Sequence, residues 1–345
     1  MADLLSVAKL AGVSRATAAR AFSTPDLVRP TTRERVFDAA RQLAFRPNKV
    51  AQQLRSQATL MIGVMVPSLD NPVFAEQLQA MEVAARTCGY SLLVTTSEYS
   101  PGRESDIVEE MLRQRVDGLV LTVADAGNSA VLEKLRLENT PCLLVYNPPA
   151  DSGFDSIGVD NHAAGMDATQ HLMALGHSRI GMVAGPLLQS DRAKQRYAGY
   201  CHAMAQAGLE ARPLVEMARH TQADLASLMP ELSGVNALTA VICTNDLLAI
   251  SLMGELQRGG FSVPGDLSVM GFDGIALGKH LYPSLCTIEQ PRAEIGRTAV
   301  HVLLAKIRGE NCIPAPLPYA LREGESVAMP TPSKSTLGTS QRSTS

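Results

Sequence analysis

From residue 60 onward, short apolar runs alternate with amphipathic helical patterns. The run LMIGVMV at 60–66 precedes a helical pattern at 72–88, and SLLVT at 91–95 precedes one at 103–114. Further apolar runs fall at 117–122, 142–146, 156–159, 179–183, 239–243, 267–270 and 286–288. Apolar strands that alternate with helices are typical of parallel sheets covered on both faces. Because about 270 residues is long for one such sheet, we expect two similar doubly wound α/β subdomains.

The first 46 residues carry a different, all-helical pattern. Three short helical segments are predicted at 4–11, 15–22 and 32–43. Gly12 can supply a turn with positive φ between the first two, and Ala8 is small enough for a close crossing. Thr31 with Glu34 fits a capping box for the third segment. The pattern predicts a helix-turn-helix.

The second helix of this module carries side chains suited to reading DNA. Ser14 is a natural N-cap, and with this start Arg15, Ala16 and Arg20 lie on the outer face. Arginine can make a bidentate contact to a guanine edge in the major groove. We therefore predict DNA contacts from Ser14, Arg15, Ala16, Thr17 and Arg20. The alternative is an amphipathic helical hairpin whose basic face is merely solvated.

Charge is distributed unevenly along the chain. The whole sequence has 31 Lys and Arg against 34 Asp and Glu, a formal net charge of -3 that by itself argues against nucleic-acid binding. Residues 1–58, however, carry ten basic and four acidic side chains, so a basic module precedes an acidic body. This asymmetry favours the DNA-binding interpretation of the N-terminal helices.

Cysteine spacing and hydropathy argue against a metal protein, a secreted protein and a membrane protein. The six cysteines lie far apart and form no CxxC pair, so we expect reduced thiols and no metal or other cofactor. The N-terminus lacks the apolar stretch of a signal peptide, and no uncharged run approaches the roughly 18 residues of a membrane span. We expect a soluble, cytoplasmic protein with no membrane partner.

Ordered motifs along the whole chain carry a family resemblance. They are SVAKLAGVSRATAARAF, TRERVFDAARQLAFRPNKVAQQLRS, PSLDNPVFAEQL, DGLVLT, GVDNHAAG, LGHSRIGMVAGP, TNDLLAI and GFDG. The sequence resembles the lactose-repressor/galactose-repressor family of transcription regulators, and GFDG and SLDNPVFAEQL look most like its gluconate-repressor branch. The resemblance implies a helix-turn-helix headpiece followed by two subdomains of the periplasmic-binding-protein type.

The segment after the headpiece resembles the family's hinge helix. Such a short helix is marginal alone and should fold only when DNA and a partner subunit hold it. By resemblance, Val50 meets its symmetry mate and Leu54 wedges into a minor-groove step. The predicted hinge contacts are Asn48, Val50, Ala51, Leu54 and Arg55. Without the resemblance, Leu54 would be an ordinary linker leucine.

Polar residues recur just after the predicted strands of the core. In doubly wound sheets, ligands bind outside the carboxyl ends of the strands. The first polar positions there are Ser68, Asn147, Asn245, Asp273 and Gln290. Such groups can exchange hydrogen bonds with vicinal hydroxyls, which predicts an effector site.

Two further side chains complete the predicted site. Arg196 adds a fixed cation, and Phe74 could cover an apolar sugar face. By resemblance, the family's effector residues fall on Arg196, Asn245, Asp273 and Gln290, with Asn147 where several relatives carry Asp. Structural alternatives remain open: Asn245 could cap a helix, Ser68 and Asn147 could shape turns, and Arg196 could pair with a surface carboxylate.

Together these features predict a transcriptional regulator, most simply a repressor. We expect a homodimer on a palindromic operator, controlled by a small carbohydrate or sugar acid such as gluconate. The two rivals are a sugar-processing enzyme and a secreted sugar-binding protein with an incidental helical N-terminus. The sequence lacks HExxH, GxSxG and P-loop motifs, and the transport protein would need a signal peptide.

The predicted division of the chain follows from these assignments. Residues 1–46 form the headpiece, 47–58 the hinge and linker, and 59–329 the effector-binding and dimerisation core. Within the core we expect one subdomain of 59–160 plus 290–318 and another of 161–289 plus 319–329. The Ser/Thr-rich tail, 330–345, has no apolar period and should be disordered. No leucine heptad follows residue 330, which favours a dimer over a coiled-coil tetramer.

Overall fold

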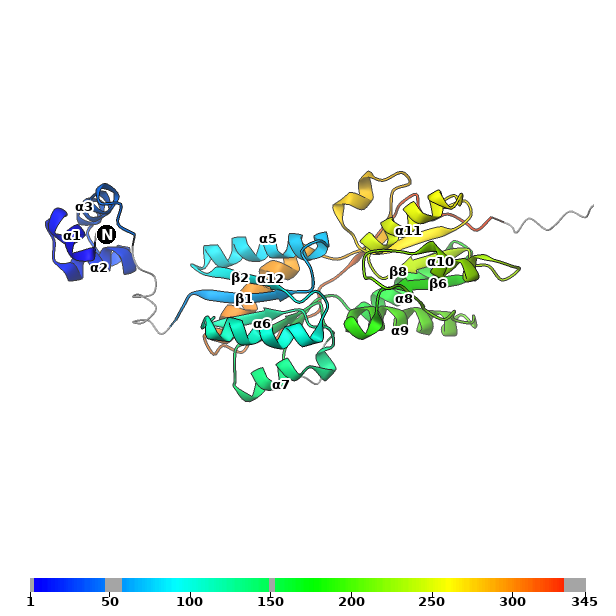
Figure 1. The fold of residues 1–345 in the computed structure, drawn as a ribbon, viewed down its shortest axis with the longest axis horizontal. Coiled ribbons are helices and arrows are strands. Elements are labelled where there is room, and N and C mark those ends of the chain that lie inside the picture. Colours follow the sequence, from blue (N-terminus) through cyan, green and yellow to red (C-terminus); the bar gives the residue numbers. More distant parts are fainter. Residues whose placement is uncertain (1–2, 47–57, 149–152, 332–345) are drawn as a thin grey trace, which may run out of the picture. The chain divides into compact units, whose positions relative to one another are not determined.

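The computed structural model describes residues 3–46, 58–148 and 153–331. The chain divides into two compact units, Met1–Leu60 and Met61–Ser345 (Figure 1). The proposed hinge residues and most of the proposed tail lie outside the described residues. Among the residues that are described, no helix is long and apolar enough to cross a membrane.

The N-terminal unit is a small helical bundle. Its helices are α1 (Leu4–Leu10), α2 (Arg15–Ser23), a 3-10 turn (Pro25–Leu27) and α3 (Pro30–Gln42). Gly12 adopts φ +64° between α1 and α2, as its place in the sequence predicts. The Ser14 side chain caps α2 by accepting a hydrogen bond from the Thr17 amide at 3.0 Å. Val7, Ala8, Ala18, Ala21 and Val36 form the buried centre.

The third helix begins earlier than the sequence pattern suggests. Pro30 is its first residue and Arg29 its N-cap, and no side chain caps this end. The predicted Thr31–Glu34 capping box is therefore wrong. Proline needs no partner for an amide hydrogen at the first helical position, and its fixed φ suits a helix start.

The first sheet of the core is parallel and has the strand order β2-β1-β3-β4-β5. Its strands are β1 (Met61–Val66), β2 (Ser91–Thr96), β3 (Gly118–Leu121), β4 (Cys142–Val145) and β5 (Ser156–Ile157). The helices after these strands are α5 (Pro72–Thr87), α6 (Pro101–Arg113) and α7 (Ala130–Leu137), with a 3-10 turn at Ala126–Asn128. We call this sheet, with its helices, the first subdomain.

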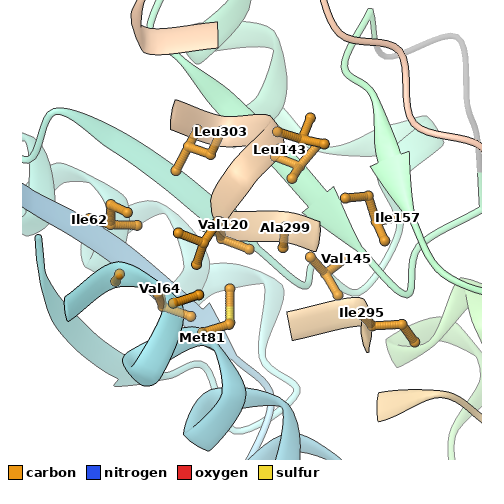
Figure 2. Packing of buried hydrophobic residues seen from close by; sticks show 14 of the residues in the cluster. Ile62, Val64, Met81, Val120, Leu143, Val145, Ile157, Ile295, Ala299 and Leu303 are labelled. Carbon is orange, nitrogen blue, oxygen red and sulfur yellow. The ribbon is translucent and has the colours of Figure 1, made fainter. Parts of the chain in front are cut away.

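A helix from late in the chain completes the first subdomain. In α12 (Arg292–Ile307), Ile295, Ala299 and Leu303 face the apolar residues of the first sheet (Figure 2). Gly296 lets α12 approach α5 closely, since a Cβ there would lie 2.4 Å from the Gln77 carbonyl oxygen. The chain therefore returns to the first sheet after it has built the second.

The second sheet has the order β11-β10-β9-β8-β6-β7 and, with its helices, forms the second subdomain. Its strands are β6 (Ile180–Ala184), β7 (Val215–Glu216), β8 (Ala240–Cys243), β9 (Ser268–Asp273), β10 (Cys286–Glu289) and β11 (Ala320–Arg322). Its helices are α8 (Asn161–Ala174), α9 (Asp191–Gln206), α10 (Leu225–Leu228) and α11 (Asp246–Arg258), with 3-10 turns at Leu187–Gln189, Met229–Leu232 and Ala276–His280. Only β11 pairs antiparallel among the described strands of this sheet. The predicted class, a helical headpiece followed by two parallel-sheet subdomains, is confirmed.

Candidate functional site

The outer face of α2 presents the side chains predicted to contact DNA. Arg15, Ala16 and Arg20 are exposed and Thr17 is half-buried. Ser14 is exposed, and its hydroxyl lies 2.9 Å from that of Thr17. We call these five residues the α2 surface, and their contact with DNA stays a prediction. Asn48, Val50, Ala51, Leu54 and Arg55 fall outside the described residues.

A small cavity lies in the core unit between the two subdomains. Its volume is about 40 Å³, close to the roughly 30 Å³ share of one water molecule in the liquid. Five of the seven residues predicted for effector binding line it: Phe74, Arg196, Asn245, Asp273 and Gln290. The other lining residues are Asn71, Val73, Tyr99, Tyr146, Ser190, Arg192, Ala193, His220 and Thr244.

Arg196 is held rigidly at the wall of this cavity. It projects from α9, donates from Nε to Asn161 Oδ1 at 2.9 Å, and donates from Nη1 to the Thr244 carbonyl. Its guanidinium lies 3.5 Å from the ring centroid of Phe272 and its Nη1 is 3.7 Å from Asp273 Oδ1. Burial lowers the pKa of Arg196 to about 10, so the cation persists at neutral pH. The partner of Arg196 is thus a buried carboxylate, not a surface one.

Asp273 and Gln290 meet on the same wall. Asp273 is the last residue of β9. Its φ is +121°, a backbone conformation that residues other than glycine rarely adopt. Gln290 Nε2 donates to Asp273 Oδ1 at 2.8 Å, whereas Gln290 Oε1 has no hydrogen-bond partner among the described residues. Burial raises the pKa of Asp273, and nearby Arg196 opposes this shift. The wall offers one acceptor that the protein does not use.

The other predicted residues have structural partners of their own. Asn245 caps α11, with Oδ1 accepting from the Leu248 amide at 2.8 Å, and its Nδ2 donates to the His220 carbonyl. Ser68 accepts from the Asp70 amide at 3.0 Å and does not line the cavity. Both structural alternatives, a cap and a turn, are therefore realised. Phe74 packs edge-on against Tyr146, with ring centroids 5.9 Å apart.

Asn147 belongs to a polar junction between the subdomains. Its Nδ2 donates to Asp191 Oδ2 at 2.8 Å, and the same oxygen accepts from the Ala126 amide at 3.0 Å. Arg192 Nη1 donates to the Val123 carbonyl at 2.9 Å. The start of α9 is thereby tied to loops that follow β3 and β4. Asn147 does not line the cavity.

Two aromatic side chains that the sequence did not single out meet across the cavity. Tyr99 follows β2 and His220 follows β7, and their rings stack with centroids 4.0 Å apart and planes at 24°. Burial raises the pKa of Tyr99 to about 12 and lowers that of His220 to about 4, so both are neutral near pH 7. Thr96, Ser97 and Glu98 come before Tyr99 after the run at 91–95, and β7 has only two residues, so the sequence singles out neither ring.

A second buried carboxylate lies near the cavity. Asp246 starts α11, and its Oδ1 accepts from the Thr287 hydroxyl at 2.6 Å while its Oδ2 accepts from the Ile275 amide at 2.7 Å. Burial, followed by the charge of Asp273, raises the pKa of Asp246 to about 7. Replacing Gly271 would push a Cβ against this carboxylate. Asp246 therefore connects the segment after β9 with β10.

Comparison with known proteins covers nearly the whole chain. Residues 59–328 match the periplasmic binding proteins and sugar binding domain of the LacI family, and residues 3–48 match the bacterial regulatory proteins of the lacI family. The transcriptional repressor PurR of Aliivibrio salmonicida (strain LFI1238) is 31% identical over 315 residues, which cover 90% of this chain and 94% of PurR. The repressor CytR of Escherichia coli (strain K12) is 32% identical over 313 residues, covering 90% and 91%.

The fold has a solved counterpart as well. The lac repressor dimer bound to operator and the anti-inducer ONPF superposes with a TM-score of 0.82 at 28% identity, and the match covers 95% of this chain and 99% of that one. These relatives are repressors, which confirms the prediction of a regulator and not an enzyme. The chain has their helix-turn-helix and their two-subdomain core, and it belongs to the LacI family of DNA-binding transcriptional repressors.

Proposed function

We propose that this repressor binds a palindromic operator as a homodimer, and that a small polyhydroxylated effector held between its two subdomains sets its affinity for that operator. The α2 surface with Arg15 and Arg20 would read the half-sites. The effector would be a sugar or a sugar acid such as gluconate. The pairing of Arg196 with Asp273 beside the unused acceptor of Gln290 carries this proposal.

The polar wall suits vicinal hydroxyl groups. Each hydroxyl both donates and accepts, so one can donate to Asp273 or to Gln290 Oε1 while accepting from Arg196. A buried acceptor with no partner costs about 1 to 3 kcal/mol, and a ligand hydroxyl would remove that penalty. The cations of this wall are balanced, Arg196 by Asp273 and Arg192 by Asp191 at 3.4 Å. Of the two ligand classes, this balance favours the neutral sugar.

The aromatic lining supports a second candidate, a flat heterocycle such as a purine. Four rings reach the cavity: Phe74, Tyr99, Tyr146 and His220. A base inserted between Tyr99 and His220 would replace their direct stack with two stacking contacts. A ligand that joins a base to a sugar would use both walls.

The size of the cavity connects ligand binding with a change in the core. A space of about 40 Å³ admits no sugar, so the subdomains or their lining side chains must move before a ligand enters. A ligand and an operator that prefer different arrangements of the core then oppose each other through the shared equilibrium.

A thermal-shift panel on the full chain tests the effector proposal. The panel holds neutral sugars, D-gluconate and other sugar acids, and purine bases and nucleosides. A compound that binds the folded state raises its melting temperature. We expect such a compound to act on the wild type and on Arg308→Ala, whose exposed ion pair with Glu310 lies outside the cavity, but not on Arg196→Ala. Equal shifts in all three proteins would contradict the assigned cavity.

The dimer proposal rests on one face of the first subdomain. β2 is an edge strand, and Leu69, Val83 and Val94 are exposed apolar side chains near it and on α5. Leu69 and Val94 also line a groove beside α5, and Val83 lines another. Unpaired strand edges and apolar grooves favour association. Because the similar lac repressor structure is a dimer on its operator, we propose a second copy of this chain as the occupant.

A further inference from the structure

Arg292 is a buried cation that the proposed effector site does not use. It is the first residue of α12, directly after Pro291, and it does not line the cavity. Its side chain is only 9% exposed. A buried guanidinium is costly unless its donors are satisfied, so its partners reveal what it holds together.

One end of the guanidinium binds the backbone of Asp273 and Gln290, the two residues that we call the effector wall. Arg292 Nη1 donates to the carbonyl oxygen of Asp273 and, at 3.3 Å, to that of Gln290. Both residues turn their side chains toward the cavity and toward each other. Asp273 holds a backbone conformation that its residue type disfavours, so it needs external restraint. Arg292 supplies one hydrogen bond to the Asp273 carbonyl and a second to the carbonyl of neighbouring Gln290.

The other end reaches the first subdomain. Arg292 Nε donates to Glu76 Oε2 at 2.7 Å, and Glu76 lies on α5. Glu289 Oε1, on β10, lies 4.0 Å from Nη2. Asp273 belongs to the second sheet and α5 to the first subdomain. The single side chain of Arg292 therefore spans the junction between them.

From these contacts we propose that Arg292 is a positioning residue: it fixes the Asp273 and Gln290 side chains in their ligand-binding geometry and anchors them to α5 through Glu76. Arg292 itself does not touch the ligand. The ligand part of this inference rests on the proposed effector site, whereas the anchoring part concerns the unliganded protein. α5 also carries Val83 of the proposed dimer face, so the anchor joins the effector wall to that face.

The anchoring is tested without ligand, by hydrogen–deuterium exchange of the full chain. Arg292→Gln should speed exchange at least tenfold in segments 268–275 and 286–291, and Arg292→Lys, which keeps the charge, should give a smaller increase. Glu76→Gln should raise exchange about threefold in 268–275 and in 72–80. The control Glu110→Gln, on the exposed face of α6, should leave all these segments unchanged.

Different results would overturn the proposal. A merely structural role predicts faster exchange everywhere, including 180–184 in β6, and a lower melting temperature. Uniform acceleration, or no change at 268–275 in Arg292→Gln, would contradict positioning. If Arg292→Gln fails to fold, Arg292→Lys decides the same question. Wild-type exchange at 268–275 in Glu76→Gln would contradict the anchor to α5.

A second arm measures binding of D-glucose, D-gluconate and adenosine by calorimetry. Any of these that binds the wild type should bind Arg292→Gln at least tenfold more weakly, and Glu110→Gln equally well. Undiminished binding to Arg292→Gln would contradict the role in ligand geometry. If none of the three binds the wild type, this arm counts against the proposed effector classes, while the exchange arm still decides the role of Arg292.

Discussion

Arg20 stands exposed on the α2 surface, where a guanidinium can face a base edge. Arg20→Ala should relax sequence preference as well as weaken binding, because a bidentate arginine–guanine contact discriminates by about 1 to 3 kcal/mol. The measurement compares affinity for a duplex selected by the wild type with affinity for a scrambled duplex. Arg41→Ala serves as the control, since Arg41 lies exposed on α3 and pairs with Asp38.

The ratio of the affinity for the selected duplex to the affinity for the scrambled duplex measures sequence preference. Arg20→Ala should lower the ratio, whereas Arg41→Ala should leave it unchanged. Loss of a phosphate contact, which we expect of Arg55, would weaken both duplexes alike and flatten the salt dependence. An unchanged ratio in Arg20→Ala would remove this residue from base recognition.

Asp246 makes stability depend on pH in a defined direction. Its folded pKa of about 7 lies above the ordinary value of 3.8, so the folded state holds the proton more tightly than the unfolded state. This contribution is fully present below about pH 3.8 and is lost as pH rises toward 7. Asp246→Asn keeps an oxygen for the Ile275 amide and removes the titration.

Chemical unfolding at pH 5 and pH 7.5 checks this sign. The free energy of unfolding of the wild type, relative to Asp246→Asn, should fall by about 2 to 3 kcal/mol over this range. Glu104 is present in both proteins, so the difference reports Asp246 together with Asp273, whose charge acts on it. A relative stability that stays the same at the two pH values would show that Asp246 is ionised throughout, and would contradict the raised pKa.

Side chains of the site could be predicted from the sequence where the end of the preceding strand could be predicted. Parallel strands end at a common edge, and this brought Asn245, Asp273 and Gln290 together without any knowledge of tertiary contacts. Ser68 shows the limit of the argument, because a polar group after a strand can equally satisfy the local backbone. His220 was beyond reach, since it follows a strand of only two residues. No sequence pattern singled out Arg292, because its partners come from three elements that are far apart in the chain or meet only in the fold.

At the scale of elements, long apolar strands were the most predictable part of the chain. β1 and β6 are buried along almost their whole length and stand out against the helices around them. β7 and β11 have two and three residues, lie at sheet edges, and are partly exposed, so they carry no apolar run. The return of α12 to the first sheet depends on packing against α5 and not on local sequence.

The hinge helix, outside the described residues, remains a prediction with a direct test. If Leu54 is a minor-groove wedge, Leu54→Ala should reduce operator bending and specific affinity, while core stability stays nearly unchanged. A set of circularly permuted operator fragments reports the bend, and a melting curve reports the core. Wild-type bending together with a melting temperature several degrees lower would mean that Leu54 packs in the protein.

For the whole molecule, association through the face of α5 and β2 is the first expectation to test. Val83→Glu places a charge on the exposed apolar surface that the second copy would cover, and a buried unpaired charge strongly disfavours association. Light scattering after gel filtration should give the mass of two chains for the wild type and of one chain for Val83→Glu. Glu110→Gln, on α6, should remain dimeric. A dimeric Val83→Glu protein would place the interface elsewhere.

The central claim is that one ligand, bound at Arg196 and Asp273, changes the affinity of this repressor for its operator. The most direct measurement is operator affinity of the full chain with and without the compound that raises its melting temperature, in the wild type, Arg196→Ala and Asp273→Ala. We predict a ligand-dependent change of roughly 5- to 150-fold in the wild type. Both variants should keep the unliganded affinity and lose about 2 to 4 kcal/mol of ligand affinity, and with it the response. A wild-type response in both variants, or ligand binding with no change in operator affinity, would contradict the account.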